Sequence, residues 1–451
     1  MAHLLDLPDE LLIQICCALR HHVDASDIKS CRLSCQRLCA ASSHLLVPLV
    51  AVDCRMASLD RFTQIMRHPT IARGVHTIRV PIHSYRHELS ELLSSFVKFV
   101  AEPALHSHVD TANLSNLWLR ALHLVHGEYQ RLYREQETLR REGTFADVVA
   151  SAVATMPHGT VLIYDDEPCN ALDDANLQVL ALQHCRLLGL DPSAWRSIWY
   201  EMLSPKTWTD LIRDDFGWDA FAPDAAFEEP QMDFLLELPA AIAKAGGRVH
   251  DMRFHLSCET PLRHLESGVT TRSDFASAMQ QLHAFALTCH QPQMEALSHD
   301  YASSVLDRAP NLRFLRVDIA SPGSHPNVLA SRPWPRLQHI HLAGVQCTLS
   351  GLVTFLDGLP AHVDSMCLDS VYLTQGSWAD VLEALRQKTY GSFTIQDPRG
   401  PDAEHVDAAF EPAGNTRSPG EQFVKHVRVP GSLSPAEAFV CRFTDTNPCQ
   451  S

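Results

Sequence analysis

The stretch Leu337-Gln338-His339-Ile340-His341-Leu342 decides the fold, because its spacing of apolar residues returns in Val363-Asp364-Ser365-Met366-Cys367-Leu368. In both stretches the apolar residues stand at i, i+3 and i+5, and the last two flank a single residue. Alternation with period two is typical of a strand with one buried face. The triplet occurs six times in the C-terminal half, with starts separated by 33, 30, 25, 26 and 27 residues: Val249/Met252/Phe254, Leu282/Phe285/Leu287, Leu312/Leu315/Val317, Leu337/Ile340/Leu342, Val363/Met366/Leu368 and Tyr390/Phe393/Ile395.

The segments after the fourth and fifth triplets have the pattern of short amphipathic helices. After the fourth triplet, an apolar stripe at helical spacing is ended by Gly358 and Pro360. After the fifth, Ser377 with Asp380 three residues later forms a capping box in front of a second stripe. The stripes consist of Leu349, Leu352, Val353 and Leu356, and of Trp378, Val381, Leu382 and Leu385. Two consecutive strand–turn–helix units of nearly constant length therefore predict a repeat.

This pattern resembles a leucine-rich-repeat array, and the resemblance implies strands on a concave face with helices outside. The Asn or Cys of that family's turn is replaced here by Val345 and Val371, so no side-chain ladder is expected to bond the turns. We therefore predict an irregular α/β solenoid over residues 146–431. The alternative is a compact α/β domain with a parallel sheet, which would also place strands side by side.

The N-terminal stretch Leu7-Pro8-Asp9-Glu10-Leu11-Leu12-Ile13-Gln14-Ile15 has the features of a helix start. Proline suits the first helical position, and the acidic pair lies at the positive end of the helix dipole. A polar break at 21–26 precedes Asp27, the predicted N-cap of a second short helix. The apolar residues of the two helices are Leu11, Leu12, Ile15, Cys16 and Leu19, and Ile28, Cys31 and Leu33. Three short helices with more apolar surface than they can bury on one another predict a docking module.

Residues 1–48 resemble the F-box, the motif that holds substrate receptors to the Skp-type adaptor of cullin ubiquitin ligases. The matching residues are Leu7, Pro8, Glu10, Leu11, Ile15, Leu19, Asp27, Ile28, Leu33, Cys35, Arg37 and Leu38. The first inter-helix connection is longer than usual, and Leu38 stands where many F-boxes carry Trp. The resemblance implies adaptor binding through Leu7, Pro8, Leu11, Ile15, Leu19, Ile28 and Leu33. The alternative is an ordinary helical hairpin that caps the domain behind it.

The region 49–145 is predicted to be mainly helical, with one strand near its start. A helix over 59–66 precedes His68-Pro69 and a strand with Val75, Ile78 and Val80. This succession is similar to the segment after the F-box in many fungal F-box proteins. Residues 89–139 are helical by period, with Trp118 among the apolar positions. Residues 432–451 are predicted to form a mobile tail or a cap.

Composition excludes several classes of protein. With 451 residues, 45% of them hydrophobic and 20% charged, the chain can bury a large core. A formal charge of −16 disfavours nucleic-acid binding, which depends on Lys and Arg neutralising phosphates. No window of eighteen apolar residues occurs, so we expect no membrane contact, and the early acidic residues do not suit a secretory signal.

Candidate catalytic and metal sites are weak. The 14 cysteines include no C-x-x-C, and Cys31, Cys35 and Cys39 are predicted to share one helix face as small apolar groups. The strand 161–164 ends in Asp165, Asp166 and Glu167, but no phosphate-binding loop accompanies it. Trp195, Trp199, Trp208 and Trp218 fit core packing better than a recognition surface. We therefore expect no cofactor, no metal and no catalytic residue.

These observations predict a non-catalytic substrate receptor, cytoplasmic or nuclear, of a Skp–cullin–F-box ubiquitin ligase. Its partners would be the Skp-type adaptor, through it a cullin, and a protein target that the sequence does not identify. The alternatives are an F-box scaffold acting outside a ligase and an enzyme with an unrecognised site in the middle segment. Copurification of a cullin distinguishes the first two, and turnover by the isolated protein is required for the third.

Overall fold

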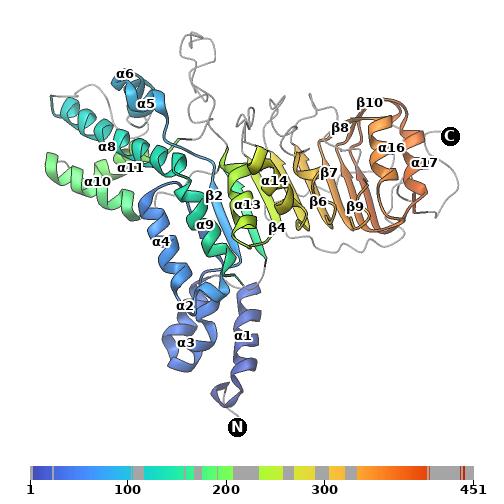
Figure 1. Ribbon diagram of the computed structural model, residues 1–451, viewed down its shortest axis with the longest axis horizontal. Helices are drawn as coiled ribbons and strands as arrows, with labels where there is room; N and C mark the ends of the chain where they lie inside the picture. Colours follow the sequence, from blue (N-terminus) through green and yellow to red (C-terminus); the bar gives the residue numbers. More distant parts are fainter. Residues whose placement is uncertain are drawn as a thin grey trace. The chain divides into compact units, whose positions relative to one another are not determined.

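The computed structural model describes residues 4–22, 25–102, 104, 116–156, 159–166, 175–189, 191–206, 233–256, 269–289, 304–319, 333–403, 406, 437, 440 and 441. The chain forms two compact units (Figure 1). Unit 1 comprises Met1–Val249 and Ser267–Phe275, and unit 2 comprises His250–Glu266 and Ala276–Ser451. Each helix among the described residues is too short or too polar to cross a bilayer.

Unit 1 begins with short helices that surround a small core. They are η1 (Leu4–Asp6), α1 (Asp9–His22), α2 (Ala25–Ser34), α3 (Gln36–Ser42) and η2 (Ser43–Leu45). Helix α1 starts at Asp9, so Pro8 directly precedes the first helical position that the sequence assigned to it. Helix α2 starts at Ala25, so Asp27 lies in its first turn and the prediction that it is the N-cap was wrong.

The cysteine-rich segment departs from the predicted single helix. Cys35 is extended, with φ −163° and ψ 163°, and it separates α2 from α3 as the N-cap of α3. Its Sγ accepts a hydrogen bond from Leu38 N at 3.5 Å. Cys31, Cys35 and Cys39 therefore do not share one continuous helix face.

The strands of unit 1 pair in parallel. They are β1 (Leu49–Ala51), β2 (Thr77–Pro81) and β3 (Thr160–Asp165), in the order β1-β2-β3. Helix α4 (Met56–Arg67) and η3 (Ala72–Gly74) connect β1 to β2, which confirms the predicted helix and strand. Helix α9 (Thr144–Ala154) precedes β3 and packs against α13 (Phe234–Lys244). The region 49–145 thus also contributes two strands to the sheet.

A second core in unit 1 is helical. Its elements are α5 (His87–Glu91), α6 (Leu93–Phe96), the π-helical turn η4 (Val97–Ala101), α8 (Asn116–Arg141), α10 (Ala175–Leu188) and α11 (Pro192–Leu203). Phe96, Tyr129 and Trp199 are fully buried there, and Trp118 packs at the margin. The predicted helicity of 89–139 is confirmed in the described residues except at Leu92, whose extended backbone separates α5 from α6.

Unit 2 contains the six predicted strands. They are β4 (Val249–Leu256), β5 (Ala284–Cys289), β6 (Phe314–Ile319), β7 (His339–Ala343), β9 (His362–Asp369) and β11 (Thr389–Gln396), all parallel and in this order. The middle residues of the triplets are aligned across the sheet as Met252, Phe285, Leu315, Ile340, Met366 and Phe393. The last residues are aligned as Phe254, Leu287, Val317, Leu342, Leu368 and Ile395. All twelve are buried, so the apolar pattern sets the register.

The helices of unit 2 also follow the pattern. Among them are α16 (Leu349–Asp357) and α17 (Trp378–Arg386), while α14 (Val269–Met279) begins in unit 1 and ends in unit 2. Helix α16 is capped by the Thr348 side chain, and α17 by that of Ser377. Helices α16 and α17 pack on each other (Figure 1). The predicted helical stripes are therefore confirmed.

Backbone pairing replaces the missing side-chain ladder in the turns. Strands β8 (Gln346–Thr348) and β10 (Tyr372–Gln375) form a short parallel pair, with Tyr372 N donating to Val345 O at 2.9 Å. Val371 O accepts from Arg399 N at 2.9 Å. Both valines are buried. Apolar side chains at the two turns therefore fill the interior while neighbouring backbones bond directly.

Part of the C-terminal tail is packed, which agrees with the predicted cap and not with a mobile tail over all of 432–451. Glu437 is buried, and its carboxylate accepts a hydrogen bond from Ile395 N at 3.1 Å. Val440 is buried as well. Because β11 is an outer strand of the unit 2 sheet, this carboxylate satisfies a donor on its edge.

The predicted α/β class with parallel strands is therefore confirmed: among the described residues, unit 1 holds three parallel strands, and unit 2 holds the six triplet strands and the short pair β8 and β10. The curvature of a leucine-rich-repeat solenoid stays a prediction.

Replacing Gly344 by Ala should destabilise unit 2 strongly. Gly344 has φ +64°, and a Cβ there would lie 1.6 Å from Ile319 O. We expect a loss on the order of 2–4 kcal/mol in the free energy of unfolding, measured by urea denaturation. Gly127→Ala is the control, because nothing lies within 4 Å of its Cβ and it stands inside a helix. That substitution should stabilise by up to about 1 kcal/mol, and an equal loss in both variants would contradict the argument.

Neighbouring residues of β9 should respond oppositely to charge. Leu368 is fully buried, so Leu368→Asp would bury an unpaired carboxylate and cost about 4 kcal/mol or more. Asp369 is half-buried and bonds only the Ser370 hydroxyl through its side chain, so Asp369→Lys should cost less than about 1 kcal/mol. Thermal melts of the two variants test this. Equal destabilisation would show that the two side chains do not face opposite sides.

Candidate protein-docking site in the N-terminal helices

Helix α1 is apolar on two sides, and only one of them is covered. Leu12 and Cys16 are buried, and Cys16 forms a small core with Ile28 and Leu45. Burial raises the pKa of the Cys16 thiol, so it stays neutral and packs as an apolar group. The exposed side carries three apolar residues at i, i+4 and i+8, which are Leu11, Ile15 and Leu19. Their spacing places them on one helix face.

Further exposed apolar side chains belong to residues that are close to this stripe along the sequence. Leu33, near the end of α2, is 87% exposed, and Leu4 and Leu5 of η1 are exposed as well. Seven of the fifteen large apolar side chains exposed in the described part of the chain lie within residues 4–33. Such a concentration is typical of a surface that another molecule covers.

Arg37 holds the Leu-Pro segment in place. Its Nε donates to Asp9 Oδ1 at 2.8 Å, and its terminal nitrogens donate to Leu7 O at 2.7 Å and to Leu5 O. One side chain from α3 thus bonds two backbone carbonyls and one carboxylate near the start of α1. The segment before Pro8 is therefore ordered by hydrogen bonds, without a buried apolar anchor of its own.

The N-terminal helices are joined firmly to the rest of unit 1. Arg32 Nε donates to the Ser43 hydroxyl at 3.2 Å, which connects α2 to η2. Gly74 of η3 lies so close to η2 that an added Cβ would be 1.5 Å from His44 O. Only glycine permits this approach. The three helices are thus a rigid part of unit 1.

The structure exposes six of the seven residues predicted to bind the adaptor, at least in part. Leu7 is half-buried, and the other five exposed ones are Pro8, Leu11, Ile15, Leu19 and Leu33. Ile28 is 2% exposed, so the expectation that it contacts a partner directly was wrong. It supplies the α2 side chain of the small core, and it supports the surface from beneath. Sequence reasoning missed Leu4, Leu5 and Ile13, whose only signal is their position beside the Leu-Pro start.

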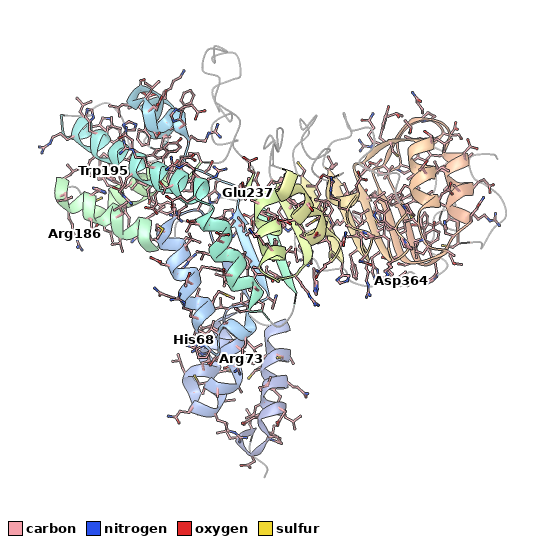
Figure 2. The ribbon with its side chains drawn as sticks, in the orientation of Figure 1. His68, Arg73, Arg186, Trp195, Glu237 and Asp364 are labelled. Carbon is pink, nitrogen blue, oxygen red and sulfur yellow. The ribbon has the colours of Figure 1, made fainter. Side chains whose placement is uncertain are left out.

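Other candidate residues of the sequence have structural partners. Asp165, at the end of β3, forms an ion pair with Arg79, and its Oδ1 accepts from Arg79 Nη2 at 2.9 Å. Trp199 is buried and stacks on His184 with a ring separation of 5.1 Å. Trp195, labelled on α11 in Figure 2, contacts Trp118 with ring centroids 5.8 Å apart. These two tryptophans pack as predicted, and Trp208 and Trp218 lie outside the described residues.

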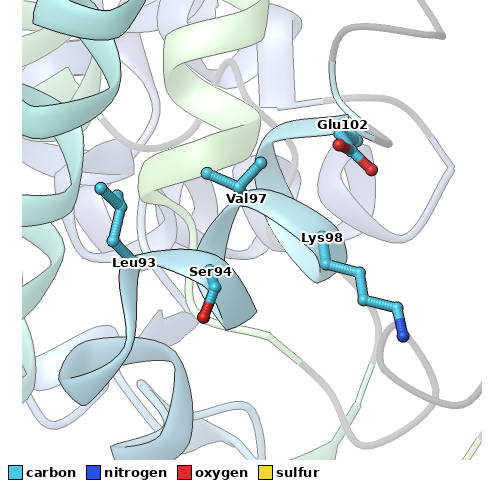
Figure 3. A pocket seen from close by; sticks show the side chains of 5 residues that line it. All are labelled: Leu93, Ser94, Val97, Lys98 and Glu102. Carbon is cyan, nitrogen blue, oxygen red and sulfur yellow. The ribbon is translucent and has the colours of Figure 1, made fainter.

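No metal or catalytic arrangement is evident among the described residues. No group of three or more His, Cys, Asp or Glu side chains there could hold a metal ion. A pocket of about 610 Å³ lies on α6 and η4 (Figure 3). Its lining offers one hydroxyl, one ammonium and one carboxylate beside apolar groups: Leu93, Ser94, Val97, Lys98 and Glu102. All five lie within residues 93–102 and no other described element contributes a polar group, so the apolar helices remain the strongest candidate site.

Removing the Arg37 side chain should loosen the Leu-Pro segment without unfolding the chain. Arg37→Ala deletes three hydrogen bonds of an exposed side chain, so we expect less than about 1 kcal/mol of global destabilisation. Backbone amides at 5–9 should exchange with solvent about tenfold faster, measured by hydrogen–deuterium exchange. Lys29→Ala is the matched control, because Lys29 is exposed and no hydrogen bond to a described residue holds its side chain. Unchanged exchange in Arg37→Ala would show that the segment is ordered by other contacts.

No protein-family model matches the chain, and no curated protein matches it. Its function must therefore be argued from its own residues.

Proposed function

We propose that the chain is the substrate-recognition subunit of a Skp–cullin–F-box ubiquitin ligase. The observation that carries the proposal is the exposed stripe Leu11, Ile15 and Leu19 on helices that already possess a core of their own. An apolar stripe that stays exposed after these helices have packed together is available to a partner. Its position directly behind the Leu-Pro start agrees with the F-box resemblance.

The order of the Leu-Pro segment supports the same role. Arg37 fixes the carbonyls of Leu5 and Leu7 in the free chain, so a partner does not have to order this segment on binding. Preordering reduces the entropic cost of association. A partner that buries Leu7, Pro8 and Leu33 would meet a surface that is already shaped.

Unit 2 would present the target. Its parallel strands place rows of mixed polar and apolar side chains opposite the buried triplets, among them Arg316, Asp318 and His341, and such rows are suited to protein recognition. The subunit would act by raising the local concentration of the target near the conjugating enzyme, which other subunits carry. No catalytic residue of this chain is needed for that role.

Adaptor binding should depend on the exposed apolar residues. We expect Leu7→Ala combined with Pro8→Ala to weaken binding of a purified Skp-type adaptor by about 2–4 kcal/mol, roughly 30- to 1,000-fold. Leu33→Asp should abolish adaptor binding. The melting temperature of this variant should hardly change, because the Leu33 side chain is 87% exposed. Isothermal titration calorimetry and thermal melts would measure both properties.

Leu187→Asp is the matched control, since Leu187 is an exposed leucine on α10. Its adaptor affinity should equal that of the unaltered chain. Full-strength adaptor binding by the double variant and by Leu33→Asp would refute the proposal. Adaptor binding without a cullin in the purified complex would instead indicate a scaffold that acts outside a ligase.

A further inference from the structure

Basic side chains gather where the strands of unit 2 begin. His283 N donates to His250 O at 2.8 Å, and Arg313 N donates to His283 O at 2.7 Å. These backbone bonds place His250, His283 and Arg313 on successive strands at the same end of the sheet. Arg336 stands three residues before the start of β7, the next strand. We call these four residues the cationic rim.

The four side chains are close enough to repel one another. The rings of His250 and His283 are edge to face, with centroids 5.0 Å apart. The pKa of His283 is lowered, first by burial and then by the positive charges of His250, Arg313 and Arg336. The lowered pKa favours the neutral form of His283, so the positive charge gathered here is that of Arg313 and Arg336, although the chain as a whole carries a formal charge of −16.

Arginines elsewhere on the strands of unit 2 are neutralised, and those of the rim are not. Arg253 Nε donates to Asp251 at 3.0 Å, and Arg316 Nη2 donates to Asp318 at 2.8 Å. In each pair the acid lies two residues away on the same strand. Arg313 and Arg336 are exposed, and neither forms an ion pair with any carboxylate in the described ranges. Their guanidinium donors are thus open to a ligand.

The positive charge is confined to one part of this end of the sheet. Further along, Gln338 and Asp364 occupy the equivalent positions, since Gln338 N donates to Arg313 O and Ser365 N donates to Gln338 O. Asp364 lies 3.2 Å from His362 and 3.9 Å from His339, and it is labelled in Figure 2. The rim therefore covers the first strands of the unit and gives way to a carboxylate.

We propose that the cationic rim binds an anionic segment of a protein, with closely spaced carboxylate or phosphate groups. Neighbouring strands are about 4.8 Å apart, so Arg313 and Arg336, at the starts of two neighbouring strands, present two permanent cations within roughly 10 Å, beside the two histidines. Alternate side chains of an extended segment are about 7 Å apart, which fits two oxyanions on such a span. Arginine binds both oxyanions through paired N–H donors. The strongly acidic chain repels longer polyanions, which favours a short protein segment over nucleic acid or an anionic membrane.

This inference deepens the proposed function and rests on it in one respect only, the identification of the bound segment as part of a ligase target. The binding chemistry itself depends on the four residues of the rim. It can therefore be tested without any ligase subunit.

The test uses the full chain and labelled peptides of about twelve residues, a length that spans several strands. One peptide has Glu at alternate positions, a second has phosphoserine there, and a third has Gln. Fluorescence anisotropy should show binding of the first two and none of the third, and the stronger of the two identifies the preferred oxyanion. Raising the salt from about 50 to 300 mM should weaken binding about tenfold or more.

Arg313→Glu combined with Arg336→Glu should lose at least about tenfold in affinity for the anionic peptides. The control is Arg67→Glu with Arg73→Glu, which changes the net charge equally at exposed positions of unit 1. It should bind within about twofold of the unaltered chain. The proposal would be overturned if the rim and control variants bound the anionic peptides equally. It would also be overturned if the unaltered chain bound duplex DNA or anionic vesicles more strongly than either anionic peptide. The rim variant should retain full adaptor binding, so a failure of the ligase proposal would be seen separately.

Discussion

The parallel register of the unit 2 strands is the constraint on which the rest of that unit depends. Each strand buries the last two residues of its triplet at the same level as its neighbours, so Met252 to Phe393 form one row and Phe254 to Ile395 the next. Side chains alternate along a strand, and a slip by one residue would turn every buried group outward. The same register leaves the intervening positions outside, and it brings the basic residues at the strand starts together.

The six triplet strands were predictable because burying one face of each strand requires the same spacing of apolar residues, and this spacing is visible in the sequence. Helices α16 and α17 were predictable for the same reason, through stripes that end at Gly358 or begin at Ser377. Strands β1, β8 and β10 were not, since three or four residues are too few to show a period. Backbone pairing at Val345 and Val371 has no side-chain signature, and so the means by which these turns are joined had to be seen in three dimensions.

The candidate site was predictable in outline from the Leu-Pro start and its helical period. The period could not separate Leu12 from Leu11, because α1 is apolar on two sides and only packing decides which side is covered. Ile28 on α2 was misassigned because only its packing with Cys16 and Leu45 shows that its side chain is covered. The Arg37 contacts were invisible because two of its acceptors are backbone carbonyls, which any sequence would supply. The cationic rim depends on strand pairing across 87 residues from His250 to Arg336, beyond the reach of any local pattern.

The exposed leucines of the N-terminal helices also govern how the free chain behaves in solution. Uncovered apolar area attracts other copies of itself, so the isolated protein should self-associate as its concentration rises. A ligand that covers this area binds the folded chain alone, and it shifts the folding equilibrium by mass action, by about 2.7 kcal/mol at a hundredfold excess over Kd. The amount of folded chain then depends on the amount of the partner that covers Leu11, Ile15, Leu19 and Leu33. Chains in excess of that partner stay uncovered, and these are the molecules exposed to aggregation and proteolysis.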